Sequence, residues 1–193
     1  MSKVRIAIVG CGTISQLNVP GYIEHPDCEI VALCDPVSER AESKAREWGI
    51  SPRICTDYGE IIADSEIDAV ELLTPTYLHA DQIIKGLQGG KHISCQKPLA
   101  TSMEEAARIS EVVTKSDRIF RVTENFLYYP PIVKAKELVM SDEIGEPSLV
   151  RIRTIRGGMT KTRIPVETDT YVWRRDPELN PGGMLYDDGW HKY

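Results

Sequence analysis

Two glycines near the N-terminus are spaced to hold a phosphate group. Gly10 and Gly12 follow a run of β-branched residues and precede a helix-like segment, which begins at Thr13 and Ile14. The first glycine permits a tight turn, and the second lets the backbone approach a pyrophosphate, which the N–H groups and positive dipole of the helix start would bind. Ser15 stands where a third glycine would be and still allows close packing. A glycine turn after a strand is often only structural, so the pattern predicts a phosphate site that needs further support.

Asp35 supplies that support, because it ends the second strand-like run. An acidic residue at this point of a βαβ unit meets the ribose hydroxyls of a bound dinucleotide. Its carboxylate would repel a 2′-phosphate, and Pro36 occupies the place of a basic residue that would attract one. Asp35 as the N-cap of the next helix is a compatible alternative. The two features together predict a dinucleotide cofactor, NAD in preference to NADP.

More polar side chains follow later strand-like runs. Thr74 and Pro75 come directly after one of them, and His79 would lie one turn into the next helix, where a structural hydrogen bond is the commoner role for a histidine. Lys97 stands between a strand end and a proline. It is placed to polarise a substrate hydroxyl or to lie near a nicotinamide, although an isolated lysine is by default only solvated. In a parallel sheet these strand ends meet a ligand at one edge.

Asp187 and His191 are four residues apart near the end of the chain, which on a helix puts a carboxylate and an imidazole on one face. Because imidazole titrates near neutrality, a histidine suits removal of a hydroxyl proton while hydride leaves the adjoining carbon. Metal binding is the alternative for this spacing. The sequence has no HExxH or CxxC partner set, so we expect no metal site.

The elements that must position these residues alternate along the first two thirds of the chain. Strand-like runs fall at Val4–Val9, Glu29–Cys34, Ala69–Leu73, Lys91–Cys95 and Ile119–Thr123. Helix-like segments fall at Thr13–Ile23, Pro36–Trp48, Tyr58–Ala63, Thr76–Gln88 and Thr101–Ser116, the last opened by a capping box from Thr101 to Glu104. This alternation predicts an α/β fold with a doubly wound parallel sheet, a Rossmann domain, over residues 1–126.

The regular alternation of strand-like and helix-like segments ends before residues 127–193, which we expect to be the incomplete start of a second α/β domain. Ile132–Met140 is helical in pattern, Leu149–Ile155 alternates like a half-exposed strand, residues 157–183 look rich in loops, and residues 184–193 look like the first turns of a helix. Without partner strands, the apolar face of residues 149–155 would be exposed or would drive association.

Composition limits the class of protein. The 193 residues are 41% hydrophobic and 27% charged with a net charge of −6, which is typical of a soluble globular chain. No stretch is long and apolar enough for a membrane helix, and no signal peptide is evident. Five cysteines without a CxxC pair indicate reduced thiols and a cytoplasmic protein. The acidic N-terminal part would repel phosphate backbones, so we expect no nucleic-acid partner.

Taken in order, these motifs resemble a known family, that of glucose–fructose oxidoreductase, inositol dehydrogenase and rhizopine catabolism proteins. The residues that carry the resemblance are Gly10-Cys11-Gly12, Asp35, Thr74-Pro75 with His79, Lys97-Pro98, Glu124-Asn125 and the glycine-rich segment from Pro181 to His191. The resemblance implies a Rossmann domain followed by an α/β domain with a large open sheet. It also implies NAD(P)-dependent hydride transfer at a hydroxyl-bearing carbon of a sugar, cyclitol or polyol.

The same resemblance implies roles for single residues. Lys97 would orient the reacting oxygen, Asp187 would hold the substrate and His191 would be the general acid/base. The nicotinamide side would be lined by Thr74, Pro75, His79, Gln96 and Asn125, and the mouth of the active site would include Trp173 and Arg174. One residue departs from the family pattern, because Gln96 replaces the usual glutamate and removes a charge near the nicotinamide.

Family members are much longer than this chain, so the resemblance predicts a C-terminally truncated substrate domain and, for the full-length protein, a homo-oligomer. Two other functions stay open. One is a regulatory protein that senses NAD(P) without turnover, which Gln96 and the missing open sheet favour. The other is an epimerase or lyase that uses its bound NAD only transiently.

Overall fold

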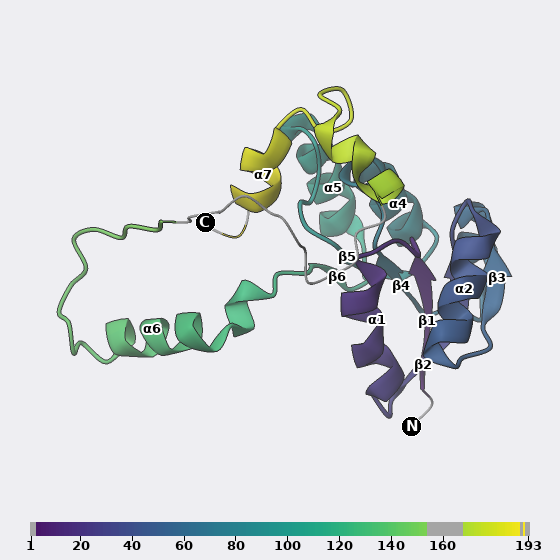
Figure 1. Cartoon of the computed structure of the whole chain (residues 1–193), viewed down its shortest axis with the longest axis horizontal. Helices are drawn as coiled ribbons and strands as arrows, with labels where there is room; N and C mark the ends of the chain where they lie inside the picture. Colours follow the sequence, from purple (N-terminus) through teal and green to yellow (C-terminus); the bar gives the residue numbers. More distant parts are fainter. Residues whose placement is uncertain (1–2, 154–167, 190, 192–193) are drawn as a thin grey trace.

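The computed structural model describes residues 3–153, 168–189 and 191. Six strands form one sheet: β1 (Val4–Val9), β2 (Cys28–Cys34), β3 (Arg53–Cys55), β4 (Ala69–Leu72), β5 (His92–Cys95) and β6 (Phe120–Val122). Five helices connect them: α1 (Ser15–Glu24), α2 (Ser38–Trp48), α3 (Tyr58–Ala63), α4 (Thr76–Gln88) and α5 (Met103–Lys115). All neighbouring strands are parallel, in the order β3-β2-β1-β4-β5-β6 (Figure 1). The predicted doubly wound α/β fold is confirmed.

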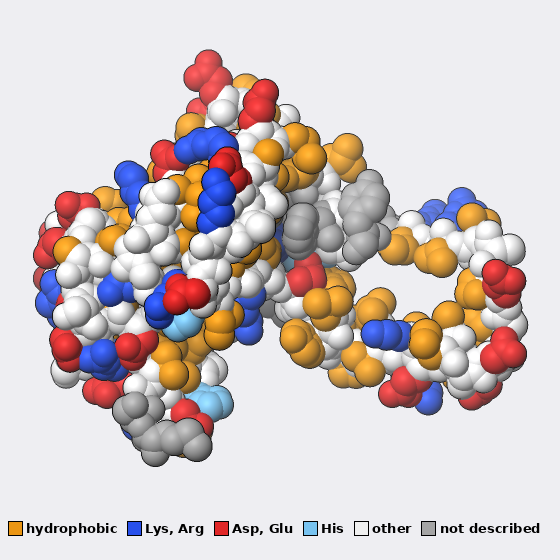
Figure 2. Space-filling view, turned by 180° about the vertical axis from the view of Figure 1, so that it is seen from behind, with side chains coloured by type: hydrophobic (Ala, Val, Ile, Leu, Met, Phe, Trp, Pro, Cys, Tyr) orange, Lys and Arg blue, Asp and Glu red, His pale blue; other side chains and the backbone are white. Residues whose placement is uncertain are grey.

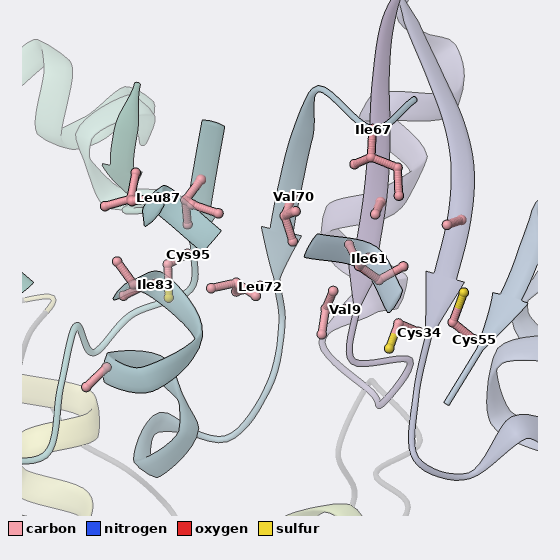
Figure 3. Packing of buried hydrophobic residues seen from close by; sticks show 14 of the residues in the cluster. Val9, Cys34, Cys55, Ile61, Ile67, Val70, Leu72, Ile83, Leu87 and Cys95 are labelled. Carbon is pink, nitrogen blue, oxygen red and sulfur yellow. The ribbon is translucent and has the colours of Figure 1, made fainter. Parts of the chain in front are cut away.

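The two faces of the sheet follow from the alternation of side chains along each strand. Ile8 of β1 and Leu33 of β2 pack on the side of α1 and α2. Their neighbours Val9 and Cys34 point to the opposite side, where α3, α4 and α5 cover the sheet. Figure 3 shows this second core, in which Ile61 of α3 and other helical side chains meet the strands. Helices therefore cover both faces of β1 and β2, which explains the nearly continuous apolar runs of these two strands.

Strand order reverses between β1 and β4, and this reversal creates the place for a ligand. The chain runs outward from β1 through β2 to β3 and then returns to pair β4 with the other side of β1. The connections leaving the carboxyl ends of β1 and β4 diverge to opposite faces, and a crevice opens between them. The short strand β3 has only three residues, too few for a recognisable period, and the sequence pattern missed it.

One helix start lies a residue away from its predicted position. The hydroxyl of Ser102, the N-cap of α5, accepts a hydrogen bond from the backbone N–H of Glu105 at 3.1 Å. Glu105 in turn accepts from the backbone N–H of Thr101 at 2.7 Å. The predicted capping box from Thr101 to Glu104 is therefore wrong by one residue, because the same stretch contains a second hydroxyl–carboxylate pair with the right spacing.

The described residues after β6 form four further elements. They are the 3₁₀ helices η1 (Phe126–Tyr128) and η2 (Thr168–Arg175) and the α-helices α6 (Pro130–Met140) and α7 (Gly183–Gly189). The predicted helices over residues 132–140 and 184–193 match α6 and, in residues 184–189, α7; residues 190, 192 and 193 lie outside the described part. The loop predicted for residues 157–183 is wrong where η2 forms, and its residues 157–167 lie outside the described part.

The strand predicted for residues 149–155 does not form in its described part, residues 149–153. A strand needs a neighbour to bond its N–H and C=O groups, and no described strand lies beside this segment. Its apolar side chains are exposed, Leu149 at 82% and Val150 at 77%. Helix α6 extends away from the sheet (Figure 1), and none of its side chains is buried. Figure 2 shows the exposed hydrophobic side chains along α6 and the segment that follows it.

The five cysteines are free thiols, and all but Cys28 are buried. Burial raises the pKa of Cys11 and of Cys34 to about 12, so these thiols stay protonated near neutral pH. Among the described helices none is long and apolar enough to cross a membrane. The division into domains at residue 126 stays a prediction.

β4 carries a buried carboxyl group, that of Glu71, on the face that α1 covers. The side chain is 1% exposed and accepts a hydrogen bond from the Tyr22 hydroxyl at 2.6 Å. Its Oε1 and the Oγ of Ser94 on β5 are buried without a well-formed hydrogen bond to any described residue. Burial raises the pKa of Glu71 above its ordinary value, since the ionised form loses its hydration. The charged carboxylate therefore opposes folding.

We expect the Glu71→Gln substitution to raise the melting temperature at neutral pH. The neutral amide removes the cost of burying a charge and can donate to Ser94 Oγ. Because the folded pKa is raised, the wild-type chain loses stability as pH rises from the unfolded value of about 4.3 towards the folded one, so the advantage of the variant should grow over that range and then level off. Each kcal/mol recovered should raise the melting temperature by about 2–4 °C.

Thermal unfolding measured across this pH range by circular dichroism checks the expectation. Glu29→Gln, at an exposed glutamate on β2, is the matched control and should leave the pH dependence of the wild type unchanged. A gain for Glu71→Gln that is the same at pH about 4 and pH about 8 would contradict the assigned cause.

Candidate functional site

The turn between β1 and α1 brings two strands and a helix start together. Gly10 has φ +96°, and its N–H donates to the carbonyl of Cys34 on β2 at 2.8 Å. A Cβ atom at Gly10 would lie 2.8 Å from the backbone carbonyl of Leu73, just after β4. Only glycine accommodates both the positive φ and this close approach. The turn therefore lies directly against the end of β4, at the reversal of strand order.

Asp35 connects this turn to the following βα unit. It is 5% exposed, and its carboxylate accepts a hydrogen bond from the backbone N–H of Cys11 at 2.9 Å and another from that of Val37 at 2.9 Å. The guanidinium of Arg40 on α2 lies 3.9 Å from the same group. Asp35 thus ties the glycine turn to Val37, which is the N-cap of α2 and has no side-chain cap. The alternative that Asp35 is itself the N-cap of this helix is therefore wrong, and its carboxylate lies at the edge of the crevice where a ribose would lie.

A cavity of about 320 Å³ opens above the glycine turn. Its lining includes most of the residues predicted to hold the cofactor: Gly10, Gly12, Thr13, Ile14, Asp35, Thr74 and Pro75. It also includes Arg40 and Tyr77, which the sequence reasoning did not select. Arg40 lies one turn into a helix with a solvent-facing charge pattern, so only its position in space marks it. The cavity is completed by Trp173 and Arg174 of η2.

His79 does not line this cavity. It is fully buried on α4, with Nδ1 2.8 Å from the carbonyl of Pro98 and Nε2 2.9 Å from that of Thr74. Burial lowers the pKa of His79 below its ordinary value, because charging the imidazole there would cost hydration. The histidine holds together the two loops that carry Thr74 and Lys97, so it shapes the site from behind.

A second cavity, of about 620 Å³, adjoins the first, since Ile14, Thr74, Trp173 and Arg174 line both. Around it lie four more of the predicted residues, Gln96, Lys97, Asn125 and His191. The Gln96 amide donates to Asn18 Oδ1 at 3.0 Å and accepts from the backbone N–H of Lys97 at 3.1 Å. The neutral residue in place of the family's glutamate is therefore fixed between α1 and the end of β5.

Lys97 and Asp187 meet, although 90 residues separate them. Lys97 Nζ donates to the Asp187 backbone carbonyl at 2.9 Å and to its carboxylate at 3.2 Å. Arg174 also pairs with the Asp187 carboxylate, which is 6% exposed. The ring of Trp173 contacts Tyr77 of α4 edge-on, with centroids 6.2 Å apart. These contacts place η2 and α7 beside the carboxyl ends of the strands.

His191 pairs with Glu124, which follows β6. Its Nδ1 lies 2.9 Å from one Glu124 carboxylate oxygen and 2.8 Å from the other. The imidazole also packs against the ring of Phe126, with centroids 4.7 Å apart. The sequence reasoning used Glu124 only as part of a motif and gave it no role in the site.

The residues present fit a dinucleotide. The glycine turn and the start of α1 would hold the pyrophosphate, Asp35 would meet the adenosine ribose, and the second cavity is large enough for the nicotinamide and a small substrate. No group of three or more potential metal ligands occurs among the residues described. Fold and crevice together define a dinucleotide-binding protein of the Rossmann class.

Comparison with known sequences identifies the family. The model of the Gfo/Idh/MocA oxidoreductase family, described as having an NAD-binding Rossmann fold, matches residues 4–124. The chain belongs to this family, as its motifs predicted, and the predicted NAD(P) cofactor class is thereby confirmed. It is 36% identical over 146 residues to scyllo-inositol 2-dehydrogenase (NAD(+)) of Bacillus subtilis, covering 75% of this chain and 42% of that protein.

Two further relatives cover nearly the whole chain. An uncharacterized oxidoreductase of Rhizobium meliloti, ORF334, is 32% identical over 98% of this chain and 54% of its own length. The crystal structure of an NAD-binding protein from Listeria innocua superposes with a TM-score of 0.77 at 26% identity, over 99% of this chain and 53% of that one. The chain thus spans about half the length of the relatives it matches.

A further solved structure is that of the Y186F mutant of KijD10, a 3-ketoreductase from Actinomadura kijaniata, in complex with TDP-benzene and NADP. It superposes with a TM-score of 0.68 at 25% identity, over 75% of this chain and 44% of that one.

Replacing Gly10 with alanine should destabilise the protein and weaken dinucleotide binding. The added Cβ meets backbone atoms of Leu73, which cannot rotate away as a side chain would. Gly49→Ala is a matched control, since Gly49 also has a positive φ, of +66°, but has open space around it. We expect Gly49→Ala to cost about 1 kcal/mol from its φ alone, and Gly10→Ala to cost about 1–3 kcal/mol more.

Urea denaturation measures the stability difference, and calorimetric titration with NAD measures the affinity. Gly49→Ala should bind NAD as the wild type does. Equal stability losses in the two variants would show that the contact with Leu73 carries no weight.

Proposed function

We propose that the protein is an NAD(P)-dependent oxidoreductase that transfers hydride at a hydroxyl-bearing carbon of a sugar, cyclitol or polyol. One observation carries the proposal. Lys97 and His191 line a cavity that adjoins the cavity of the glycine turn. A cationic donor and an imidazole base therefore lie beside the place where the reactive end of a dinucleotide would be. The oxidoreductase family membership supports the same class of reaction.

Each residue of this chain has a distinct part in the proposed step. Lys97 Nζ donates to the reacting oxygen and orients it, and His191 takes the hydroxyl proton. The bound cofactor supplies the hydride acceptor at C4 of its nicotinamide. Asp187 already accepts from Lys97 and pairs with Arg174, so in this geometry it positions Lys97. For Asp187 to hold the substrate as well, one of these two contacts must give way when the substrate binds.

We propose NAD as the preferred cofactor, because the Asp35 carboxylate lies at the ribose end of the first cavity. Arg40, 3.9 Å from that carboxylate, partly offsets its negative charge. Relatives name both cofactors, NAD(+) for the Bacillus subtilis dehydrogenase and NADP(+) for a D-xylose 1-dehydrogenase of Haloarcula marismortui.

A sensor that binds NAD(P) without turnover is the second candidate. Two contacts favour it. The Lys97 amine is engaged by Asp187 through both its carboxylate and its backbone oxygen, and the neutral Gln96 is held by Asn18. A sensor would bind NAD and form no NADH with any of a panel of polyols. An epimerase or lyase would also form no net NADH but would change the substrate.

The Asp35→Ala substitution should weaken binding of NAD by roughly tenfold or more, the value of a charge-assisted hydrogen bond, and should affect NADP less. The variant also loses two backbone hydrogen bonds, so the ratio of the two dissociation constants, measured by calorimetric titration, is the decisive quantity. Asp57→Ala removes the aspartate that caps α3 and should leave the ratio unchanged. An equal loss of affinity for both cofactors in Asp35→Ala would limit Asp35 to a structural role.

The Lys97→Ala substitution should abolish formation of NADH from an accepted polyol while the dissociation constant for NAD changes little, since the proposed pyrophosphate and ribose contacts lie in the first cavity, which Lys97 does not line. Absorbance of NADH follows turnover, and titration follows binding. Lys85→Ala, at an exposed lysine of α4, is the control and should keep full turnover. Unchanged turnover in Lys97→Ala would overturn the role given to this lysine.

A further inference from the structure

We propose that Glu124 is a positioning residue that fixes the tautomer and the ring orientation of His191. The inference deepens the proposed function, on which it rests. Glu124 lies 67 residues before His191 in the chain, directly after β6, and the two side chains are 16% and 12% exposed. Both oxygens of the carboxylate face the same imidazole nitrogen, Nδ1.

The direction of this hydrogen bond determines the state of the ring. An ionised carboxylate has only acceptor sites, so the proton must be on the imidazole nitrogen that faces it. A neutral imidazole carries one N–H, and placing it on Nδ1 leaves the lone pair on Nε2. The Glu124–His191 pair therefore selects the tautomer in which Nε2 is the basic nitrogen.

The position of Glu124 is itself fixed. Its Oε1 accepts a hydrogen bond from the backbone N–H of Phe126 at 2.8 Å, so the carboxylate is held at the start of η1. The Phe126 ring lies against the imidazole at an interplanar angle of 38°. One short segment after β6 thus supplies both a hydrogen bond to the edge of the imidazole and a contact to its face, and the two together restrict rotation of the ring.

This arrangement matches what the proposed step needs from a base. Oxidation of the substrate to a carbonyl compound would break its O–H bond and transfer the proton to Nε2 of His191, and a bound NAD(P)⁺ would supply the acceptor for the hydride that leaves the adjoining carbon. The imidazolium so formed then donates its Nδ1–H to the adjacent Glu124 carboxylate, which stabilises the new charge. Glu124 touches neither the substrate nor the cofactor in this scheme.

A purely structural ion pair would hold residue 191 at the end of β6 without fixing which ring nitrogen of the neutral imidazole carries the proton. The tautomer of His191 therefore distinguishes a structural role of Glu124 from a positioning role. In the ¹⁵N-histidine-labelled chain, above the pH at which imidazole titrates, the NMR signals of His191 should report an Nδ1–H tautomer in the wild type. Glu124→Ala should shift the population towards Nε2–H. Glu124→Gln, whose amide oxygen still accepts, should retain Nδ1–H, and Glu146→Ala, at an exposed glutamate, should change nothing.

The chain has four histidines, and the signals that are missing from the spectrum of the His191→Gln variant are those of His191. An Nε2–H tautomer in the wild type, or an unchanged tautomer in Glu124→Ala, overturns the proposal whether or not the protein turns over. This result is separate from a failure of the proposed function, which would be NAD binding by the wild type with no reaction of any polyol.

Kinetics supply the second test. With an accepted polyol, Glu124→Ala should lower kcat by about 100-fold or more, the usual share of a positioned base, with little change in KM or in the dissociation constant for NAD. Glu124→Gln should fall between this variant and the wild type, because it keeps the tautomer but loses the charge. An unchanged kcat in Glu124→Ala would limit Glu124 to a structural role.

Discussion

The close contact between the Gly10 turn and the Leu73 carbonyl is the constraint on which the rest of the structure depends. It sets the end of β1 against the end of β4, at the one place where the strand order reverses. Because the turn is so tight, the start of α1 lies at the crevice, and the backbone N–H of Cys11 reaches the Asp35 carboxylate. The proposed phosphate end and ribose end of the dinucleotide site thus belong to one packed unit.

Away from this unit, the site is assembled by contacts across long stretches of sequence. Lys97, which follows β5, is held by Asp187 of α7. Glu124, which follows β6, holds His191. His79 holds the loops that carry Thr74 and Pro98 in place and lines neither cavity. The proposed nucleotide half of the site is therefore built on the sheet itself, whereas the proposed reaction centre depends on how η2, α7 and His191 pack against the carboxyl ends of the strands.

What the sequence predicts and what it misses follow this division. The glycine turn, Asp35 and the alternation of strands and helices are local patterns, and short-range sterics and apolar periodicity make them readable. The pairing of His191 with Glu124 is not readable, since nothing in the spacing of two residues so far apart marks their contact. The sequence places His79 close to the edge of the sheet where a ligand is expected, but its side chain is buried between the loops that carry Thr74 and Pro98.

Two errors in the elements have equally plain causes. Residues 149–153 alternate like a strand, but alternation describes only one side of a ladder, and no described strand supplies the other side. At α5, Ser102 rather than Thr101 caps the helix because two hydroxyl residues stand in succession, each three residues before a glutamate. Local pattern defines the kind of element, while neighbours decide whether it forms and where it begins.

The Lys97–Asp187 contact closes a loop of 90 residues, and the entropy of closing such a loop grows only with the logarithm of its length. Doubling the loop would cost about 0.6 kcal/mol. The stretch after α6 can therefore lengthen or shorten over evolutionary time at little cost in loop-closure entropy. Selection can change its length while Glu124 and Phe126, which lie before α6, keep their contacts with His191.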